Sequence, residues 1–372
     1  MCSSDLHLVG GLVDREVADA GVLQADRHAD PAEPGADDRD ARRTRAVAPT
    51  HVRQSRLDGV STAFRDLLAT GPLPMDGGFA TELEALGEDL SDDLWSARLL
   101  CDGPASVEAV HLAYLRAGAR IVITASYQAS RASFARVGIE PTEADRLLAS
   151  SVTLAQAARR TWEREAPFAP ETLVAASLGP YGAMLAEGQE YTGDYGDADA
   201  ATLERFHHDR VAALLGPAPD LLAWETIPNI VEAEVIAALQ ERFAGPEAWV
   251  AFQCADGGRI ADGTPIEEAV GRVAGAPGVR AVGCNCTQPE HVLEVIERIR
   301  VAAPTLAVVV YPNDGRVWDG AARTWAVGGA GRFPADAVCG CRDAGAGLIG
   351  GCCGVGPDGV RAIAEALGSP HG

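Results

Sequence analysis

Three cysteines of this sequence have the chemistry and the spacing to bind a metal ion. Cys352 and Cys353 are adjacent and follow the apolar run 346–349, and Cys286 follows a second apolar run, 279–283. Runs of this kind are typical of buried parallel strands. Three thiolates at two strand ends would supply three ligands to Zn²⁺ and leave the fourth tetrahedral position to a substrate. The alternative is that these cysteines only fill the core.

Cys284 leaves a further alternative open. It lies two residues before Cys286, so its side chain points to the same side if the strand continues. It would then replace or assist a ligand, and a fourth protein thiol would make the site a closed, structural one. For the remaining thiols after the N-terminal segment we favour core or structural positions. Cys254 and Cys101 are expected to be buried, and Cys284, Cys339 and Cys341 are not needed as ligands.

The composition is that of a soluble globular protein. The chain has 372 residues, of which 47% are hydrophobic and 23% charged. It contains no uninterrupted apolar run of about 18 residues and no signal peptide pattern at its N-terminus, so we expect a cytoplasmic protein without a membrane partner. In a reducing cytosol, clustered thiols favour metal binding or chemistry over structural disulfides.

The charge excludes several classes of function. The formal net charge is −22 and the 31 cationic side chains are scattered, which argues against a nucleic-acid partner. The sequence has no lysine, so all of these cations are arginines. This excludes Schiff-base chemistry, a pyridoxal-phosphate lysine and a P-loop, since arginine cannot replace the amine in any of them.

Residues 1–58 differ in composition from the rest of the chain. The segment 29–40 is polar, carries both signs of charge and lacks aromatic side chains. Such a segment cannot bury enough apolar surface to become ordered. We therefore expect a disordered extension, or translated upstream sequence, without a functional role, followed by a single domain over residues 59–372.

The remainder of the chain alternates between short apolar runs and segments of helical periodicity. Eight strand–helix units with nearly continuous apolar strands predict a parallel (β/α)₈ (TIM) barrel of roughly 310 residues. A doubly wound open sheet is the alternative, but no Gly-x-Gly-x-x-Gly follows the first strand. The eight expected strands are 73–75, 121–123, 173–176, 221–224, 249–252, 281–283, 306–310 and 348–349.

Polar residues follow these strands. In a barrel of this kind the chemistry lies at the carboxyl ends of the strands. Carboxylates, thiols, amides and phenols should therefore meet on one face of the barrel. The residues concerned include Asp76-Gly77-Gly78 after the first strand, Ser126-Tyr127 after the second, Glu225-Thr226 after the fourth and Asn285-Cys286 after the sixth.

From Leu73 to Leu367 the chain resembles the homocysteine S-methyltransferases, zinc-dependent barrels that move a methyl group onto homocysteine. Within that family it is most similar to the branch that uses S-methylmethionine or S-adenosylmethionine, and less similar to the branch that uses betaine. The motifs that carry the resemblance are Met75-Asp76-Gly77-Gly78, Ile123-Thr124-Ala125-Ser126-Tyr127-Gln128-Ala129, Gly179-Pro180-Tyr181-Gly182-Ala183, Gly193-Asp194-Tyr195, Glu225-Thr226, Asn285-Cys286, Val310-Tyr311-Pro312-Asn313 and Gly350-Gly351-Cys352-Cys353.

The resemblance implies a zinc site and two substrates. Cys286, Cys352 and Cys353 would hold Zn²⁺, and the sulfur of homocysteine would take the open position. A free thiol has a pKa near 8.5, whereas a coordinated thiol is deprotonated and can attack the methyl group of a sulfonium donor at neutral pH. The product would be methionine.

The resemblance also implies which residues bind the substrates. Asp76 and Glu225 would accept hydrogen bonds from the ammonium group of homocysteine. Backbone N–H groups of Gly77 and Gly78 would approach its carboxylate. The remaining substrate-binding residues would be Thr226, Asn285 and Tyr127. The aromatic ring that faces the sulfonium would be that of Tyr127, Tyr181 or Phe79.

Other readings remain open from the sequence. Asp76 and Glu225 could instead cap neighbouring helices, and His207-His208 fits helix packing better than a metal site. The enzyme could use betaine or another donor, or a selenol acceptor. A non-enzymatic barrel with a closed structural zinc site is a third possibility, and the oligomeric state, monomer or small homo-oligomer, is not predicted.

Overall fold

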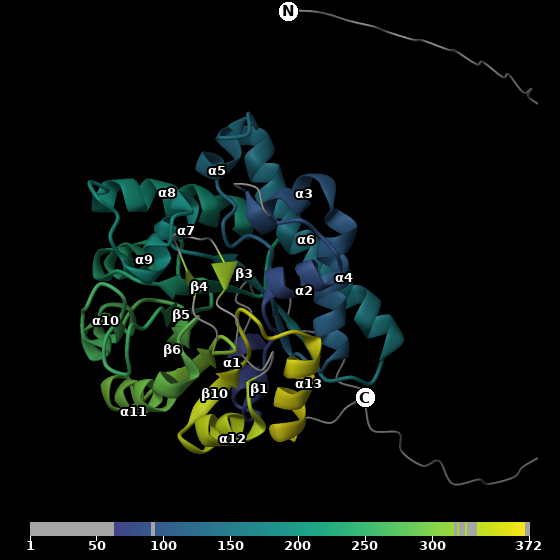
Figure 1. Cartoon of the computed structure of the whole chain (residues 1–372), viewed down its shortest axis with the longest axis vertical. Helices are drawn as coiled ribbons and strands as arrows, with labels where there is room; N and C mark the ends of the chain where they lie inside the picture. The colour runs from purple at the N-terminus through teal and green to yellow at the C-terminus, as the bar shows by residue number, and fades with distance from the viewer. Residues whose placement is uncertain (1–62, 91–93, 316–317, 320–323, 326–332, 369–372) are drawn as a thin grey trace, which may run out of the picture. The chain divides into compact units, whose positions relative to one another are not determined.

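Eight parallel strands form the centre of the molecule and helices surround them (Figure 1). The computed structural model describes residues 63–90, 94–315, 318–319, 324–325 and 333–368. The predicted extension 1–58 lies outside these residues and stays a prediction. The strands are β1 (Leu73–Pro74), β2 (Ile121–Ile123), β3 (Leu173–Leu178), β4 (Leu221–Ile227), β5 (Ala248–Phe252), β6 (Val279–Asn285), β7 (Ala307–Tyr311) and β10 (Ala346–Ile349).

The sheet closes on itself. Its order is β1-β10-β7-β6-β5-β4-β3-β2, and a parallel bridge between Met75 and Ile121 joins the two ends. Across this seam the N–H of Asp76 donates to Ile121 O at 3.1 Å and the N–H of Arg120 donates to Pro74 O at 2.8 Å. The predicted (β/α)₈ barrel is therefore confirmed, and the open sheet is excluded. Two short strands, β8 (Trp318–Asp319) and β9 (Thr324–Trp325), lie between β7 and β10 along the chain. They pair antiparallel in a separate two-stranded sheet.

Helices follow the strands along the chain and cover their outer face (Figure 1). Several begin with proline at the first position, as in α4, α6 and α13, where its fixed φ suits a first turn. The helices are α1 (Ala63–Leu68), α2 (Phe79–Ala85), α3 (Leu99–Asp102), α4 (Pro104–Arg116), α5 (Arg131–Ala135), α6 (Pro141–Glu165), α7 (Tyr181–Leu185), α8 (Ala200–Leu215), α9 (Ile230–Arg242), α10 (Ile266–Val273), α11 (Val292–Ala302), α12 (Ala335–Asp343) and α13 (Pro357–Ala366), with 3₁₀ turns η1 (Trp95–Arg98), η2 (Gln189–Tyr191) and η3 (Pro289–His291).

The strands divide the core into an inner and an outer part. In β4, Leu221 and Ala223 point into the barrel, whereas Leu222 and Trp224 pack under the helices, as the two-residue period of a strand requires. Helix α1 contributes Phe64 to the inner part, 6.2 Å from the ring of Trp249 near the start of β5. It thus covers the end of the barrel where the strands begin and leaves the opposite end for chemistry.

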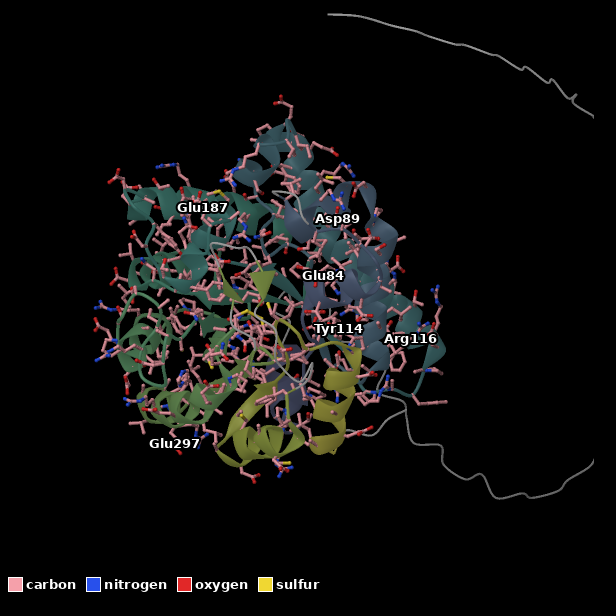
Figure 2. The ribbon with its side chains drawn as sticks, in the orientation of Figure 1. Glu84, Asp89, Tyr114, Arg116, Glu187 and Glu297 are labelled. Atoms are coloured by element: carbon pink, nitrogen blue, oxygen red, sulfur yellow. A yellow bond between two sulfur atoms is a disulfide. The ribbon has the colours of Figure 1, made fainter. Side chains whose placement is uncertain are left out.

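Charged side chains occupy the outer surface of the helices (Figure 2). Arg116 at the end of α4, for example, pairs with Glu165 of α6 at 2.6 Å, with both side chains largely exposed. Within the described part of the chain, none of the helices has both the length and the apolar character needed to cross a membrane.

Gly283 allows β6 and β7 to approach closely. A Cβ atom there would lie 1.6 Å from the carbonyl oxygen of Val309, its partner in β7. Gly283→Ala should therefore separate the two strands and lower the free energy of unfolding by at least about 3 kcal/mol, measured by urea denaturation. Gly271→Ala in α10 is the control, because its Cβ would meet nothing within 4 Å. It should be neutral or stabilising by up to about 1 kcal/mol. Equal effects of the two changes would contradict this account of the barrel.

Candidate functional site

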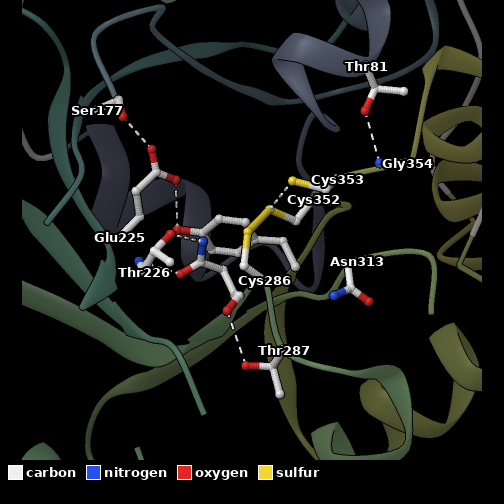
Figure 3. The surroundings of a disulfide bond; sticks show 12 residues. Thr81, Ser177, Glu225, Thr226, Cys286, Thr287, Asn313, Cys352, Cys353 and Gly354 are labelled. Atoms are coloured by element: carbon white, nitrogen blue, oxygen red, sulfur yellow. Dashed lines mark hydrogen bonds between the residues drawn. A yellow bond between two sulfur atoms is a disulfide. The ribbon is translucent and has the colours of Figure 1, made fainter. Parts of the chain in front are cut away.

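The three predicted metal ligands come together at the carboxyl end of the barrel (Figure 3). The sulfur atoms of Cys286, Cys352 and Cys353 all lie within 4.8 Å of one another. Those of Cys352 and Cys353 are 4.0 Å apart, and Cys286 and Cys352 are joined by a disulfide bond. The grouping that the strand ends suggested is therefore present, with two of the three thiols oxidised.

The backbone at the end of β7 positions all three cysteines. The N–H of Cys286 donates to Tyr311 O at 3.2 Å, and the N–H of Cys352 donates to Pro312 O at 2.7 Å. The N–H of Asp314 donates in turn to Cys353 O at 3.0 Å. Strand β7 lies between β6 and β10 in the sheet, so the residues that follow it can reach both cysteine loops.

Cys284 does not belong to this group. The expectation that it shares a side with Cys286 required the strand to continue, but β6 ends at Asn285 and Cys286 has a positive φ of 47°. This left-handed backbone breaks the alternation and turns Cys286 to the site. Cys284 points outward into the core under the helices, where a hydrogen bond with Cys254 and burial raise the pKa of its thiol.

The other thiols of the described residues lie outside this group. Cys254 and Cys341 are buried, as expected for core or structural positions, and Cys339 is half-buried in α12. Cys101 is exposed at the end of α3, so the prediction that it is buried is wrong. In the short helix α3, Leu99 and Leu100 are the residues that point inward.

A turn after the cysteine pair packs against the loop that follows β1. The N–H of Val355 donates to Cys352 O at 3.0 Å, and Gly354 has the positive φ of 84° that this turn needs. The N–H of Gly78 donates to Val355 O at 2.9 Å, and a Cβ on Gly78 would lie 2.7 Å from Cys352 O. The N–H of Gly78 is therefore already used, which leaves Gly77 as the candidate for a substrate carboxylate.

Two buried carboxylates lie beside the cysteines. Asp76 accepts the N–H of Ile123 on Oδ2 at 2.7 Å, while its buried Oδ1 has no hydrogen-bond partner among the described residues. Glu225 accepts hydrogen bonds from the hydroxyls of Ser177 and, at 3.2 Å, Tyr311. Neither carboxylate caps a helix, since the N-cap residues of α2 and α9 are Gly78 and Asn229.

Burial dominates the electrostatics of this pair. It raises the pKa of Glu225 to about 7, against the hydrogen bonds from Ser177 and Tyr311, which lower it. Burial likewise raises the pKa of Asp76 well above its ordinary value, and the negative charge of Glu225 adds to the effect. A cationic group placed between them would relieve both carboxylates.

Thr226, Asn285 and Tyr127, which were predicted from the sequence to bind substrate, lie close together, and their role in binding stays a prediction. Thr226 has a φ of 59°, which is rare and strained for a β-branched residue. The side chain of Asn285 holds it there: Oδ1 accepts the N–H of Thr226 at 2.6 Å and Nδ2 donates to its Oγ1 at 2.7 Å. Burial raises the pKa of Tyr127 well above its ordinary value, and the neighbouring side chain of Thr226 acts against this shift. Asn285 therefore acts on the site through Thr226.

Comparison with known proteins identifies the family of this chain. A family model described as homocysteine S-methyltransferase matches residues 73–367. The chain belongs to the homocysteine S-methyltransferase family. It is therefore a methyltransferase enzyme.

Relatives of this methyltransferase are found in bacteria and plants. It is 43% identical over 292 residues to the homocysteine S-methyltransferase of Escherichia coli K12, which covers 78% of this chain and 94% of that protein. It is 41% identical over 315 residues to homocysteine S-methyltransferase 1 of Zea mays, covering 82% and 97%. The crystal structure of the E. coli homocysteine methyltransferase MmuM in a metallated form superposes with a TM-score of 0.73 at 41% identity, covering 81% of this chain and 98% of that one. An oxidized form of MmuM superposes with the same TM-score.

The sequence analysis did not single out Arg210 of this methyltransferase. Its guanidinium is fully buried and donates to the carbonyl oxygens of Ala129 (2.9 Å), Gly179 (2.6 Å), Ser126 (3.1 Å) and Tyr127 (2.8 Å). It therefore ties the loops after β2 and β3 together and fixes Tyr127. The available signal was its place on the buried stripe of α8, which also contains His207.

His207 packs inside the protein and is not near the cysteines. Its Nε2 lies 2.7 Å from Glu232 Oε1, and both side chains are buried. The same carboxylate accepts the N–H of Tyr181 at 2.7 Å on Oε1 and the hydroxyl of Tyr195 at 2.6 Å on Oε2. The expectation of a packing role for this histidine is confirmed.

Replacing Arg210 by methionine should destabilise the protein strongly. Four carbonyl oxygens would lose their hydrogen bonds in a buried place, and each unsatisfied group costs about 1–3 kcal/mol. At the lower end of that range the four losses together should reduce the free energy of unfolding by about 4 kcal/mol, measured by urea denaturation. The control is Arg205→Met on the exposed face of α8, which should change it by less than about 0.5 kcal/mol. A similar small effect of both changes would rule out the proposed role of Arg210.

Proposed function

We propose that this enzyme transfers a methyl group from S-methylmethionine or S-adenosylmethionine to the thiolate of homocysteine held at Zn²⁺, and so forms methionine. The observation that carries the proposal is the group of three cysteine sulfurs beside a buried carboxylate pair at the mouth of the barrel. The names of the E. coli and Zea mays relatives support homocysteine as the acceptor.

The donor set fits zinc. Four tetrahedral ligands with Zn–S distances near 2.3 Å place sulfur atoms about 3.8 Å apart, and Cys352 and Cys353 are 4.0 Å apart. Cys353 lies outside the disulfide bond, and reduction of the bond between Cys286 and Cys352 would supply the second and third thiolates of the set. The metallated form of MmuM supports a metal in this family. When bound, zinc supplies a Lewis acid that keeps the acceptor thiol deprotonated at neutral pH.

The carboxylate pair suits the amino-acid end of homocysteine. An ammonium between Asp76 and Glu225 would give a hydrogen-bond donor to the unpaired Oδ1 of Asp76 and offset the repulsion between the two acids. The N–H of Gly77, which donates to no carbonyl in the described chain, would receive the substrate carboxylate. These contacts would hold the amino-acid end of homocysteine, while the metal site would hold its sulfur.

Methyl transfer then needs mainly positioning. The acceptor thiolate attacks the methyl carbon in line, a new carbon–sulfur bond forms, and the bond to the donor sulfur breaks with its electron pair. The donor loses its positive charge and leaves as a neutral sulfide. The residues of the chain contribute by holding both substrates in line and excluding water.

A closed structural zinc site is less well supported. It would require a fourth protein ligand, and Cys284, the candidate for that role, faces the outer core. Among the described residues the ligand group contains three cysteines. This favours a site with a position open to substrate.

The direct test measures methionine formation from homocysteine with S-methylmethionine, S-adenosylmethionine and betaine in separate reactions. We expect product from at least one sulfonium donor. Cys352→Ala should lose the metal and lower the rate by more than about 100-fold, since even outer-shell changes at metal sites cost about 10–100-fold. Cys339→Ala, in α12, is the control and should keep both. The proposal would be refuted if neither sulfonium donor gave methionine. It would also be refuted if Cys352→Ala kept full activity and its metal.

The activity should also depend on pH through Glu225. Its pKa in the free enzyme is about 7, and the ionised form is the one that attracts an ammonium. We therefore expect kcat/KM for homocysteine to fall as the pH drops below about 7, approaching tenfold per pH unit, while kcat changes less because the bound ammonium favours the ionised carboxylate. In Glu225→Gln, kcat/KM should be low and this acid limb should be lost. An unchanged limb in that variant would assign the titration to another group.

A further inference from the structure

The loop after β3 carries a half-buried glutamate that the mechanism above does not use. Glu190 lies in the 3₁₀ turn η2, and its Oε2 atom is buried without a hydrogen-bond partner among the described residues. Burial raises the pKa of this carboxyl to about 7. No arginine of the described chain forms an ion pair with it. An acceptor in this situation needs a donor from outside the chain.

Glu190 lies close to the phenols of Tyr127 and Tyr191. Burial raises the pKa of Tyr127 and of Tyr191, and the negative charge of Glu190 raises both further. Tyr191 is also close enough to Cys353 for the thiol to contribute to its shift. Tyr127 comes from the loop after β2, on the same rim of the barrel. A carboxylate flanked by aromatic rings is a lining that attracts organic cations.

The backbone fixes the carboxylate in place. The N–H of Tyr191 donates to Gly188 O at 3.0 Å and that of Gly193 donates to Gln189 O at 2.8 Å. Asn229 Nδ2 donates to Gly193 O at 2.8 Å, which ties the segment to the start of α9. On the other side α7 packs so closely that a Cβ on Gly182 would lie 2.7 Å from the backbone nitrogen of Glu190. The loop is thus preorganised rather than dependent on a ligand.

We propose that Glu190 binds the ammonium group of the methyl donor, so that the enzyme selects sulfonium donors that also carry an amino group. The inference rests on the proposed function, in which Asp76 and Glu225 already serve the ammonium of homocysteine. A second amino-acid substrate brings a second ammonium and needs a further carboxylate.

The chemistry of Oε2 selects among cations. A sulfonium sulfur has three carbon substituents and no hydrogen, so it cannot donate a hydrogen bond, whereas an ammonium group can. The rings of Tyr127 and Tyr191 suit the sulfonium, and Glu190 suits the ammonium. Betaine, whose nitrogen carries four carbon substituents, would leave Oε2 without a donor.

The test compares donors in Glu190→Gln and in a matched control. Glu187→Gln changes an exposed carboxylate three residues earlier on the same loop (Figure 2). Steady-state kinetics would be measured with S-methylmethionine and with dimethylsulfonioacetate, a sulfonium without an amino group. Loss of a charge-assisted hydrogen bond should raise KM for S-methylmethionine by about 10–100-fold in Glu190→Gln. The KM for homocysteine, the metal content, the melting temperature and the kinetics with dimethylsulfonioacetate should stay within about twofold, and Glu187→Gln should resemble the wild type.

The outcomes separate this inference from the proposed function. If the wild type forms no methionine from S-methylmethionine, the proposed function itself fails for that donor. If the wild type is active and Glu190→Gln has an unchanged KM for S-methylmethionine, only the inference about Glu190 is overturned. Equal losses with both donors would also overturn it, because they would mean a role other than ammonium recognition. Should Glu190→Gln melt at a lower temperature, Glu190→Asp, which keeps the charge, gives the same comparison of donors and should retain part of the preference.

Discussion

The hydrogen bonds from the end of β7 are the interaction on which the site depends. Strand β7 lies between the two strands that deliver cysteines, and the backbone of residues 311–314 bonds to Cys286, Cys352 and Cys353. Tyr311 takes part twice: its carbonyl holds the loop of Cys286, and its hydroxyl donates to Glu225 while accepting Trp249 Nε1 at 3.1 Å. Tyr311 therefore contacts one member of each group, Cys286 and Glu225, and a change in the register of β7 would move both of these residues.

The inside of the barrel changes from apolar to polar along its length, and this has a thermodynamic consequence. Glu225 follows the inward residues Leu221 and Ala223 of β4, so the strand period alone turns it into the barrel. Burial raises its pKa from the ordinary 4.5 to about 7. Between these values the folded state holds a proton that the unfolded chain has released, so the contribution of Glu225 to stability falls as the pH rises through this range. An unliganded site at neutral pH is thus less stable than the same site with a cation bound.

Much of the architecture was predictable because it rests on local patterns. Each apolar run formed a strand, and the residues directly after the runs met on one rim, including the three cysteines and the two carboxylates. The orientation of Cys284 was not predictable, because it depends on one backbone angle at Cys286 that tertiary hydrogen bonds impose. Arg210 was visible as a polar residue on an apolar helix face, but only the carbonyl oxygens of distant loops explain why it is buried. Glu190 lies on a loop, where no periodicity marks a buried side chain.

The charges of the site fit a reaction that removes charge. Asp76, Glu225 and Glu190 are all buried or half-buried without an arginine partner in the described chain, and the nearby buried cation, Arg210, is occupied by backbone carbonyl oxygens. Such a rim attracts the ammonium groups of two amino-acid substrates and the positive charge of a sulfonium donor. Under the proposed function, transfer of the methyl group converts the sulfonium donor into a neutral sulfide, so the aromatic contacts of Tyr127 and Tyr191 weaken in the product. The negative surroundings therefore hold the positively charged donor more strongly than the neutral sulfide formed from it, and this difference helps the product to leave.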